Sequence, residues 1–103
     1  MGVEQRRFPR LPLDVEVDFK DRAIARSKNI SKEGICLVSE DRLEEGKILN
    51  LRFFLPDTVE PIHAYAKVMW VRDASEHYCE VGLKFWDINE QDEKRLNGYF
   101  EEQ

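Results

Sequence analysis

The sequence predicts a mainly β fold, a six-stranded antiparallel β-barrel followed by one C-terminal α-helix. Apolar and polar residues alternate in six short segments spaced regularly between residues 13 and 85, as in strands that bury one face. Turn-forming residues such as Pro56-Asp57 end some of these segments. The apolar spacing becomes helical near the C-terminus. A small barrel with a helix packed on it accounts for both patterns.

The first twelve residues are expected to form a flexible arm, next to a barrel domain of residues 13–103; the whole chain is a single domain. The arm is polar and basic, and it lacks the alternation that follows it. Pro9 and Pro12 each disfavour helix in the preceding residue. We therefore expect the arm to run extended without forming the interior of a strand.

Six strands are expected after the arm. The first alternates apolar with acidic residues from Leu13 to Phe19, and the last alternates from Tyr78 to Phe85. The expected ranges are 13–19, 23–28, 34–39, 48–55, 63–72 and 78–85. A helix follows, in which Asn89 caps the N-terminus and acidic residues occupy the first turn. Its apolar stripe comes from Leu96, Tyr99 and Phe100.

Composition limits the classes of function. The 103 residues are 42% hydrophobic and 36% charged, which is typical of a globular domain. No apolar run approaches the ~20 residues of a membrane span, and the N-terminus is too polar for a signal peptide. We therefore expect a soluble cytoplasmic protein. The net charge of −5 argues against a non-specific nucleic-acid binder, whereas a basic arm on an acidic body favours a small anionic ligand.

No catalytic or metal site is expected. Cys36 and Cys79 lie far apart and are interpreted as reduced, buried small hydrophobic residues. His63 and His77 lack the spacing of zinc ligands. No nucleophile has a base at a recognisable spacing, and no glycine-rich phosphate loop occurs, so enzymatic activity and a bound cofactor are not expected.

Two clusters of residues are not explained by the packing or the turns of the predicted fold. The first is Arg6-Arg7-Phe8-Pro9-Arg10 on the arm, and the second is Asn29-Ile30-Ser31-Lys32-Glu33-Gly34 between the second and third strands. Together they match the Arg-x-x-x-Arg and Asp/Asn-x-Ser-x-x-Gly motifs of the PilZ family, in order and separation. The resemblance covers nearly the whole chain, including the segments 68–72 and 81–85 and the C-terminal helix.

This resemblance implies a PilZ-like split barrel that acts as a bacterial receptor for the second messenger cyclic di-GMP. Asn29, Ser31 and Gly34 would then contact one guanine, while Arg6 and Arg10 hold phosphates and bases with help from Arg7. Trp70 matches a position where some relatives place an aromatic residue beside the ligand. A tryptophan of the barrel core is the alternative, and the sequence leaves both open.

The chemistry of the motif residues agrees with such a ligand. Cyclic di-GMP is a dianion with two guanines, and an arginine fork matches both a phosphate and the O6/N7 pair of guanine. Lysine lacks this planar fork. Asn29 offers a donor and an acceptor, Ser31 offers a hydroxyl, and Gly34 allows a close approach of the backbone or a positive φ.

Two other classes of function are alternatives to a cyclic di-GMP receptor. A PilZ-like adaptor could dock a protein partner without nucleotide, although both motifs are intact. A small barrel could bind single-stranded RNA, but that class needs aromatic residues in a positive groove. The expected partners are therefore cyclic di-GMP and an unidentified downstream protein, with no nucleic-acid polymer and no membrane. The sequence leaves open the process controlled, the oligomeric state, and whether one nucleotide or a stacked pair binds.

Overall fold

The computed structural model describes residues 9–19 and 24–103. The predictions for Arg6 and Arg7, and for most of the arm, therefore lie outside the described residues. The described part of the chain contains seven strands and one helix. Their bounds are β1 Leu11–Pro12, β2 Glu16–Asp18, β3 Ile24–Ile30, β4 Gly34–Ser39, β5 Ile48–Phe53, β6 Ile62–Asp73, β7 Cys79–Ile88 and α1 Glu90–Glu101.

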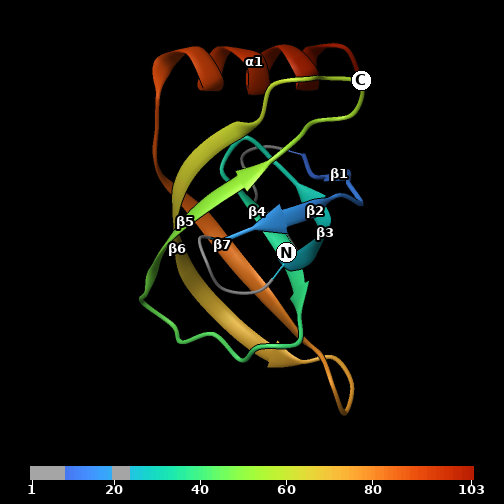
Figure 1. Cartoon of the computed structure of the whole chain (residues 1–103), viewed down its shortest axis with the longest axis vertical. Helices are drawn as coiled ribbons and strands as arrows, with labels where there is room; N and C mark the ends of the chain where they lie inside the picture. Colours follow the sequence, from blue (N-terminus) through green and yellow to red (C-terminus); the bar gives the residue numbers. More distant parts are fainter. Residues whose placement is uncertain (1–8, 20–23) are drawn as a thin grey trace, which may run out of the picture.

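The strands form one antiparallel sheet in the order β1-β3-β2-β5-β6-β7-β4, and the pairing of β3 with β4 closes it. The result is the predicted six-stranded barrel with β1 as an additional short strand beside β3. Figure 1 shows α1 lying across one end of the barrel, with the hairpin between β6 and β7 extending toward the opposite end. The predicted mainly β barrel with a C-terminal helix is confirmed.

The first predicted strand, 13–19, is shortened to β2 at Glu16–Asp18, because a buried serine binds the segment before it, and the short strand β1 lies at Leu11–Pro12 within the predicted arm. Ser27 on β3 has a side chain that donates to the carbonyl oxygen of Leu13 and accepts from the amide of Val15 at 2.9 Å. Its own amide donates to the carbonyl of Val15 at 2.9 Å. The predicted burial is nevertheless correct, since Leu13 and Phe19 are both buried. β7 is also longer than predicted and ends at Ile88.

The core lies inside the barrel and under α1. Its fully buried side chains come from every barrel strand and from the helix, and they include Val17, Ile30, Ile35, Leu37, Leu51, Phe53, Ile62, Val68, Val81 and Leu96. Burying each such side chain contributes roughly 1.5–3 kcal/mol. The alternation predicted from the sequence therefore places the polar residues of the same strands on the outer face of the barrel.

Hydrogen bonds from the first two turns of α1 fix the helix to the barrel. The side chain of Asn89 accepts from the amide of Asp92 at 2.7 Å, which is the predicted N-cap. Asp92 is buried, and its carboxylate accepts from the amide of His63 at the start of β6 at 3.0 Å. Arg95 donates to the carbonyl of Pro61 at 3.0 Å. No helix in the described part is long and apolar enough to cross a membrane.

Candidate ligand-binding site

Strand pairing brings two of the predicted site residues onto one line across the outer face of the barrel. Asn29 on β3 pairs with Cys36 on β4, Cys36 pairs with Gly82 on β7, and Gly82 pairs with Trp70 on β6. The neighbours of these residues along the strands, among them Leu83, point into the core. Residues that are 41 positions apart in the sequence, Asn29 and Trp70, thus share one surface.

A tight turn joins β3 to β4 and carries Ser31. The hydroxyl oxygen of Ser31 accepts from the amides of Glu33 at 3.1 Å and Gly34 at 3.3 Å, and the amide of Ser31 donates to the carbonyl of Gly34 at 2.8 Å. The carbonyl of Glu33 accepts from the amide of Phe85 at 2.8 Å, which ties the turn to β7. The serine therefore shapes the turn, and its hydroxyl proton remains able to donate to a ligand.

Gly34 is required by the close approach of two backbones. A Cβ at this position would lie 1.9 Å from the carbonyl oxygen of Leu83 and 3.1 Å from the Cα of Lys84. Its φ is not positive; among the described glycines only Gly46 has a positive φ. Of the two reasons expected for this glycine, close approach therefore applies, although the neighbour is the backbone of β7. Its predicted contact with a ligand stays a prediction.

Four of the predicted residues line one hollow of about 190 Å³ on this surface: Arg10, Ser31, Gly34 and Trp70. The pairing of Leu11 with Ile30 brings the end of the arm beside the turn that follows β3. Arg10 comes from that arm, Ser31 from the turn, and Trp70 from β6. The remaining lining residues are Glu33, Met69, Gly82, Leu83 and Lys84.

Trp70 is a surface residue, so the alternative of a core tryptophan is wrong. It is 38% exposed, and the strand irregularity between Val68 and Trp70 turns its side chain outward. A Cβ at position 82 would lie only 2.2 Å from the Cε2 and Nε1 atoms of the indole. The ring therefore occupies the space that a side chain on β7 would need, and it forms one wall of the hollow.

The side-chain oxygen of Asn29 is buried and has no hydrogen-bond partner within residues 9–19 and 24–103. Such a group is costly, since an unsatisfied buried acceptor loses about 1–3 kcal/mol. Buried polar atoms without a partner deserve an explanation, and a donor supplied by a ligand is one of the standard ones. Asn29 is not among the residues that line the hollow of about 190 Å³, so this buried oxygen is an acceptor without a partner beside the hollow and not a part of its wall.

Charged residues border the same line of the sheet. Glu80 on β7 accepts from Lys28 at 2.7 Å and from Arg72 at 2.7 Å. The hydrogen bonds from Lys28 and then from Arg72 hold the pKa of this carboxyl below its ordinary value. Burial raises the pKa of the Cys36 thiol, and the charge of Glu80 adds to that rise, while nearby cations oppose it.

Comparisons with known proteins show the family of this chain. The PilZ domain family model matches residues 4–102, which is nearly the whole chain. The chain belongs to the PilZ domain family. Members of this family are receptor or binding domains, and solved relatives include complexes with cyclic di-GMP. No curated protein sequence matches the chain significantly.

Three solved structures illustrate the shared PilZ fold. The inhibitor of motility MotI/DgrA of Bacillus subtilis is 25% identical with a TM-score of 0.81, and the match covers 94% of this chain and 49% of that one. YcgR of Escherichia coli in complex with c-di-GMP is 15% identical with a TM-score of 0.76, covering 95% and 45%. The K. pneumonia MrkH–c-di-GMP complex is 22% identical with a TM-score of 0.76, covering 95% and 52%.

The chain therefore spans about half the length of each of these relatives. The YcgR and MrkH structures are less than 25% identical to it, so they show the common fold. What those longer proteins bind and regulate is a property of the whole proteins, and it reaches this PilZ domain only as a proposal.

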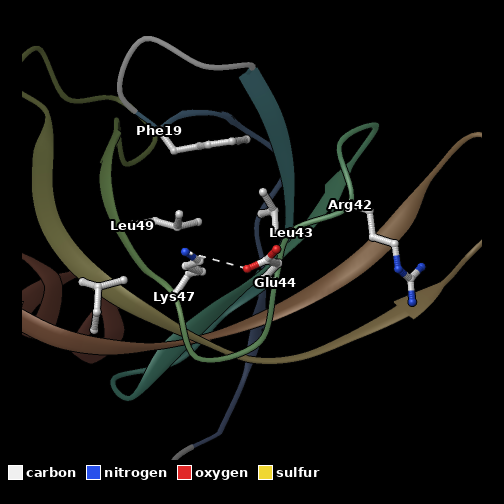
Figure 2. Close-up of a pocket in the computed structure, with 7 residues that line it drawn as sticks. Phe19, Arg42, Leu43, Glu44, Lys47 and Leu49 are labelled. Carbon is white, nitrogen blue, oxygen red and sulfur yellow. Dashed lines mark ion pairs between the residues drawn. The ribbon is translucent and has the colours of Figure 1, made fainter.

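A second hollow, of about 420 Å³, lies at the end of the barrel away from α1, where the loop between β4 and β5 turns (Figures 1 and 2). Its lining includes Phe19, Leu43 and Leu49, and Lys47 pairs with Glu44 at 3.7 Å beside it. Figure 2 shows the apolar side chains directed into the space between the strands. None of the motif residues in the described part of the chain lines it, so the predicted site residues do not point to this hollow.

Metal ligands do not gather in the described part of the chain. No group of three or more His, Cys, Asp or Glu side chains there could hold a metal ion. Cys36 and Cys79 are free thiols and both are buried, as expected for small hydrophobic residues. Cys79 lies at the hairpin end of β7, near the carbonyl of Asp41 at 3.3 Å.

Sequence reasoning did not assign to the site five residues that line the hollow: Glu33, Met69, Gly82, Leu83 and Lys84. One signal was present, because an isolated glycine inside a strand often marks a close approach of a ligand or another chain segment. Gly82 is such a residue. Met69 enters the site through the irregularity next to Trp70, which depends on the pairing of β6 with β7. No pattern in the sequence predicts that irregularity.

Proposed function

We propose that this PilZ domain is a receptor for cyclic di-GMP, bound on the outer face of β3, β4, β6 and β7. The observation that carries the proposal is the convergence on one hollow of Arg10, Ser31, Gly34 and Trp70. A nucleotide needs such a mixture: a guanidinium for its phosphates, an aromatic surface for a base, and small polar groups for the edge of a base.

Asn29 would read the guanine. Its buried side-chain oxygen is an acceptor without a partner in the described part of the chain, and guanine carries N–H donors on its edge. Ser31, whose hydroxyl proton is not used in shaping the turn, would donate to a phosphate or base oxygen. Adenine presents a different set of donors and acceptors, so these two residues would favour guanine over adenine.

The arm would complete the site. A hollow of about 190 Å³ is smaller than the roughly 300–1,000 Å³ of most small-molecule sites, so part of the ligand would lie outside it. The chain enters β1 beside the turn that carries Ser31. Arg6 and Arg7, four and three residues before Arg10, would therefore reach the exposed part of the ligand and hold its phosphates.

Binding would also carry the signal. A dianion that bridges the arm to the turn would create a composite surface of arm, nucleotide and barrel. A downstream protein could recognise that surface. We infer that this takes place in the bacterial cytoplasm and involves no catalytic step and no metal.

Calorimetry with the purified protein tests the proposal. Cyclic di-GMP should bind, and cyclic di-AMP should bind at least about tenfold more weakly because the base edge is mismatched. Arg10→Ala should weaken binding by roughly tenfold or more, which corresponds to the loss of one charge-assisted bond. Arg42→Ala is the matched control, since Arg42 is exposed and pairs with Asp73 away from the site.

Two results would contradict the receptor function. Absence of binding by the parent protein would leave the nucleotide-free adaptor as the better interpretation. Equal affinity for the two cyclic dinucleotides would mean that the site reads phosphates and not guanine.

A further inference from the structure

Arg72 contacts Trp70, one wall of the hollow, although it belongs to neither sequence motif and is not itself among the residues that line the hollow. It follows Trp70 by two residues on β6, and its guanidinium carbon lies 5.1 Å from the centroid of the indole ring. Its Nε and Nη2 atoms donate to one oxygen of Glu80 at 3.1 and 2.7 Å. The side chain is 67% exposed, so this ion pair contributes little to stability.

The acid that orients Arg72 is itself fixed. Glu80 pairs with Arg72 across β7 and β6, and only 13% of its side chain is exposed. Its second oxygen accepts from Lys28 on β3 at 2.7 Å. One carboxylate thus supports two cations, and the trio keeps a net positive charge.

The same surface gathers a third cation from the arm. Burial raises the pKa of Cys36 first and Glu80 adds to the rise, while the charges of Lys28, Arg10 and Arg72 lower it. All three cations therefore act on one buried thiol in the line of residues between Asn29 and Trp70. Lys28 on β3, Arg10 on the arm and Arg72 on β6 thus bring positive charge close to this thiol from three separate segments, with Glu80 opposing them.

The guanidinium of Arg72 has donors to spare. Arginine carries five N–H donors in a planar fork, and two of them bind Glu80. The other three have no hydrogen-bond acceptor within residues 9–19 and 24–103. They include both N–H groups at Nη1, at the end of the fork away from Nε. These donors are therefore available to the acceptors of a ligand.

We propose that Arg72 is a further binding residue for cyclic di-GMP, and that its fork contacts the O6/N7 edge of a guanine lying against Trp70. Glu80 keeps the fork oriented for this contact, and Gly82 leaves the room in which the indole lies. The inference rests on the proposed receptor function and adds the residue that selects guanine on the Trp70 side of the site. Asn29 and Ser31 would read the ligand from the other side.

Calorimetry of the full chain with cyclic di-GMP tests this inference. Arg72→Ala should weaken binding about tenfold or more. Arg72→Lys should weaken it to a similar extent, because lysine keeps the charge but lacks the fork. Arg52→Ala is the matched control: Arg52 is also an exposed arginine over an aromatic ring, 5.3 Å from the centroid of Phe54, but it lies on β5 outside the site. Its affinity should equal that of the parent.

A second measurement separates recognition from general attraction. The preference for cyclic di-GMP over cyclic di-AMP should shrink in Arg72→Ala, because adenine offers a donor where guanine offers O6. If Arg72→Ala binds like the parent, or if Arg72→Lys restores full affinity, the contact with the guanine edge is wrong. If the parent protein does not bind cyclic di-GMP, both the receptor function and the role of Arg72 are wrong. If the parent binds and only the Arg72 variants behave otherwise than expected, the receptor function stands and the role of Arg72 alone is wrong.

Discussion

At the scale of single residues, Gly82 sets the position of Trp70. The Nε1–Cε2–Cζ2 edge of the indole lies where a Cβ at position 82 would be, at 2.2 to 2.6 Å. The indole is at the surface and can swing outward, whereas the backbone of β7 cannot move easily because it pairs with β4 and β6. A side chain at position 82 should therefore displace the tryptophan and leave the barrel intact.

We predict that Gly82→Ala weakens cyclic di-GMP binding by about tenfold and changes the melting temperature little. Calorimetry and thermal unfolding measure the two effects. Gly98→Ala is the matched control, because a Cβ there meets nothing within 4 Å. It lies in α1, so alanine should stabilise the helix by roughly 0.5–1 kcal/mol without affecting the ligand. Unchanged binding in Gly82→Ala would show that the position of the indole is unimportant.

Asn29 illustrates a conflict between stability and binding. Its side-chain oxygen is buried and lacks a partner within the described residues, so the folded protein without ligand bears a desolvation cost there. We predict that Asn29→Ala unfolds at the same urea concentration as the parent or a higher one, while its affinity for cyclic di-GMP falls at least about tenfold. A variant that loses stability and keeps its affinity would contradict this role for Asn29.

The carboxyl of Glu80 should make stability depend on pH. Hydrogen bonds from Lys28 and from Arg72 hold its pKa below the ordinary value of 4.5. A group with a lowered pKa in the folded state stabilises the protein above its unfolded pKa, and this stabilisation is lost as the pH falls through the folded pKa. The unfolding free energies of the parent and Glu80→Gln should therefore differ at neutral pH and converge below pH 4.5. A difference that stays constant across that range would exclude this linkage.

At the scale of elements, α1 depends on one buried carboxylate. Asp92 accepts from the amide of His63 at 3.0 Å and from Arg95 at 3.3 Å, which fixes the first turn of the helix to β6. Asp92→Ala would leave that backbone amide without its partner. We predict a loss of about 1–3 kcal/mol in the free energy of unfolding, measured by urea denaturation. Glu90→Ala removes an exposed acid from the same turn and should cost no more than about 0.5 kcal/mol. Equal losses would mean that only the helix dipole matters.

The elements that could be predicted from the sequence are those governed by local pattern. The cap at Asn89 and the inward face of the strand predicted at 48–55 each depend on residues close in the chain. The cap appears as expected, and Leu51, Phe53 and Leu55 are buried, although β5 ends at Phe53. The shortening of the first predicted strand could not be predicted, because it depends on the hydroxyl of Ser27 reaching backbone atoms of Leu13 and Val15, fourteen and twelve residues earlier. Irregularities in strand pairing, such as the one before Trp70, depend equally on distant partners.

At the scale of the whole molecule, the motifs predicted three of the residues that line the hollow of the candidate site, but not all of its walls. Arg10, Ser31 and Gly34 could be found because their residue types and order resemble those of a family. Gly82 and Arg72 can be connected with Trp70 only when the pairing of β6 with β7 is known, because their contacts with that residue depend on this pairing. The sequence also left open whether Trp70 lies at the surface or in the core. Only the pairing of β6 with β7 shows that it lies at the surface.

In the proposed receptor, the arm would link the binding of the ligand to signalling. The described part of the arm enters β1 beside Ser31, and Arg10 lines the hollow. If cyclic di-GMP bridges Arg6, Arg7 and Arg10 to the barrel, those three peptide bonds should become less accessible to a protease. The cost of ordering the arm would oppose binding, and the charge-assisted bonds to the ligand would have to exceed it.

We predict that saturating cyclic di-GMP slows tryptic cleavage after Arg6, Arg7 and Arg10, as followed by mass spectrometry of the fragments. Cyclic di-AMP at the same concentration serves as the ligand control, and cleavage of the urea-denatured chain, which should not change, shows that trypsin itself is unaffected. The Arg10→Ala variant should lose protection at Arg6 and Arg7 as well, because weaker binding leaves the bridge unformed. Cleavage that is unaltered by a ligand shown to bind would mean that the arm is not part of the switch, and that the change recognised by a partner occurs on the barrel itself.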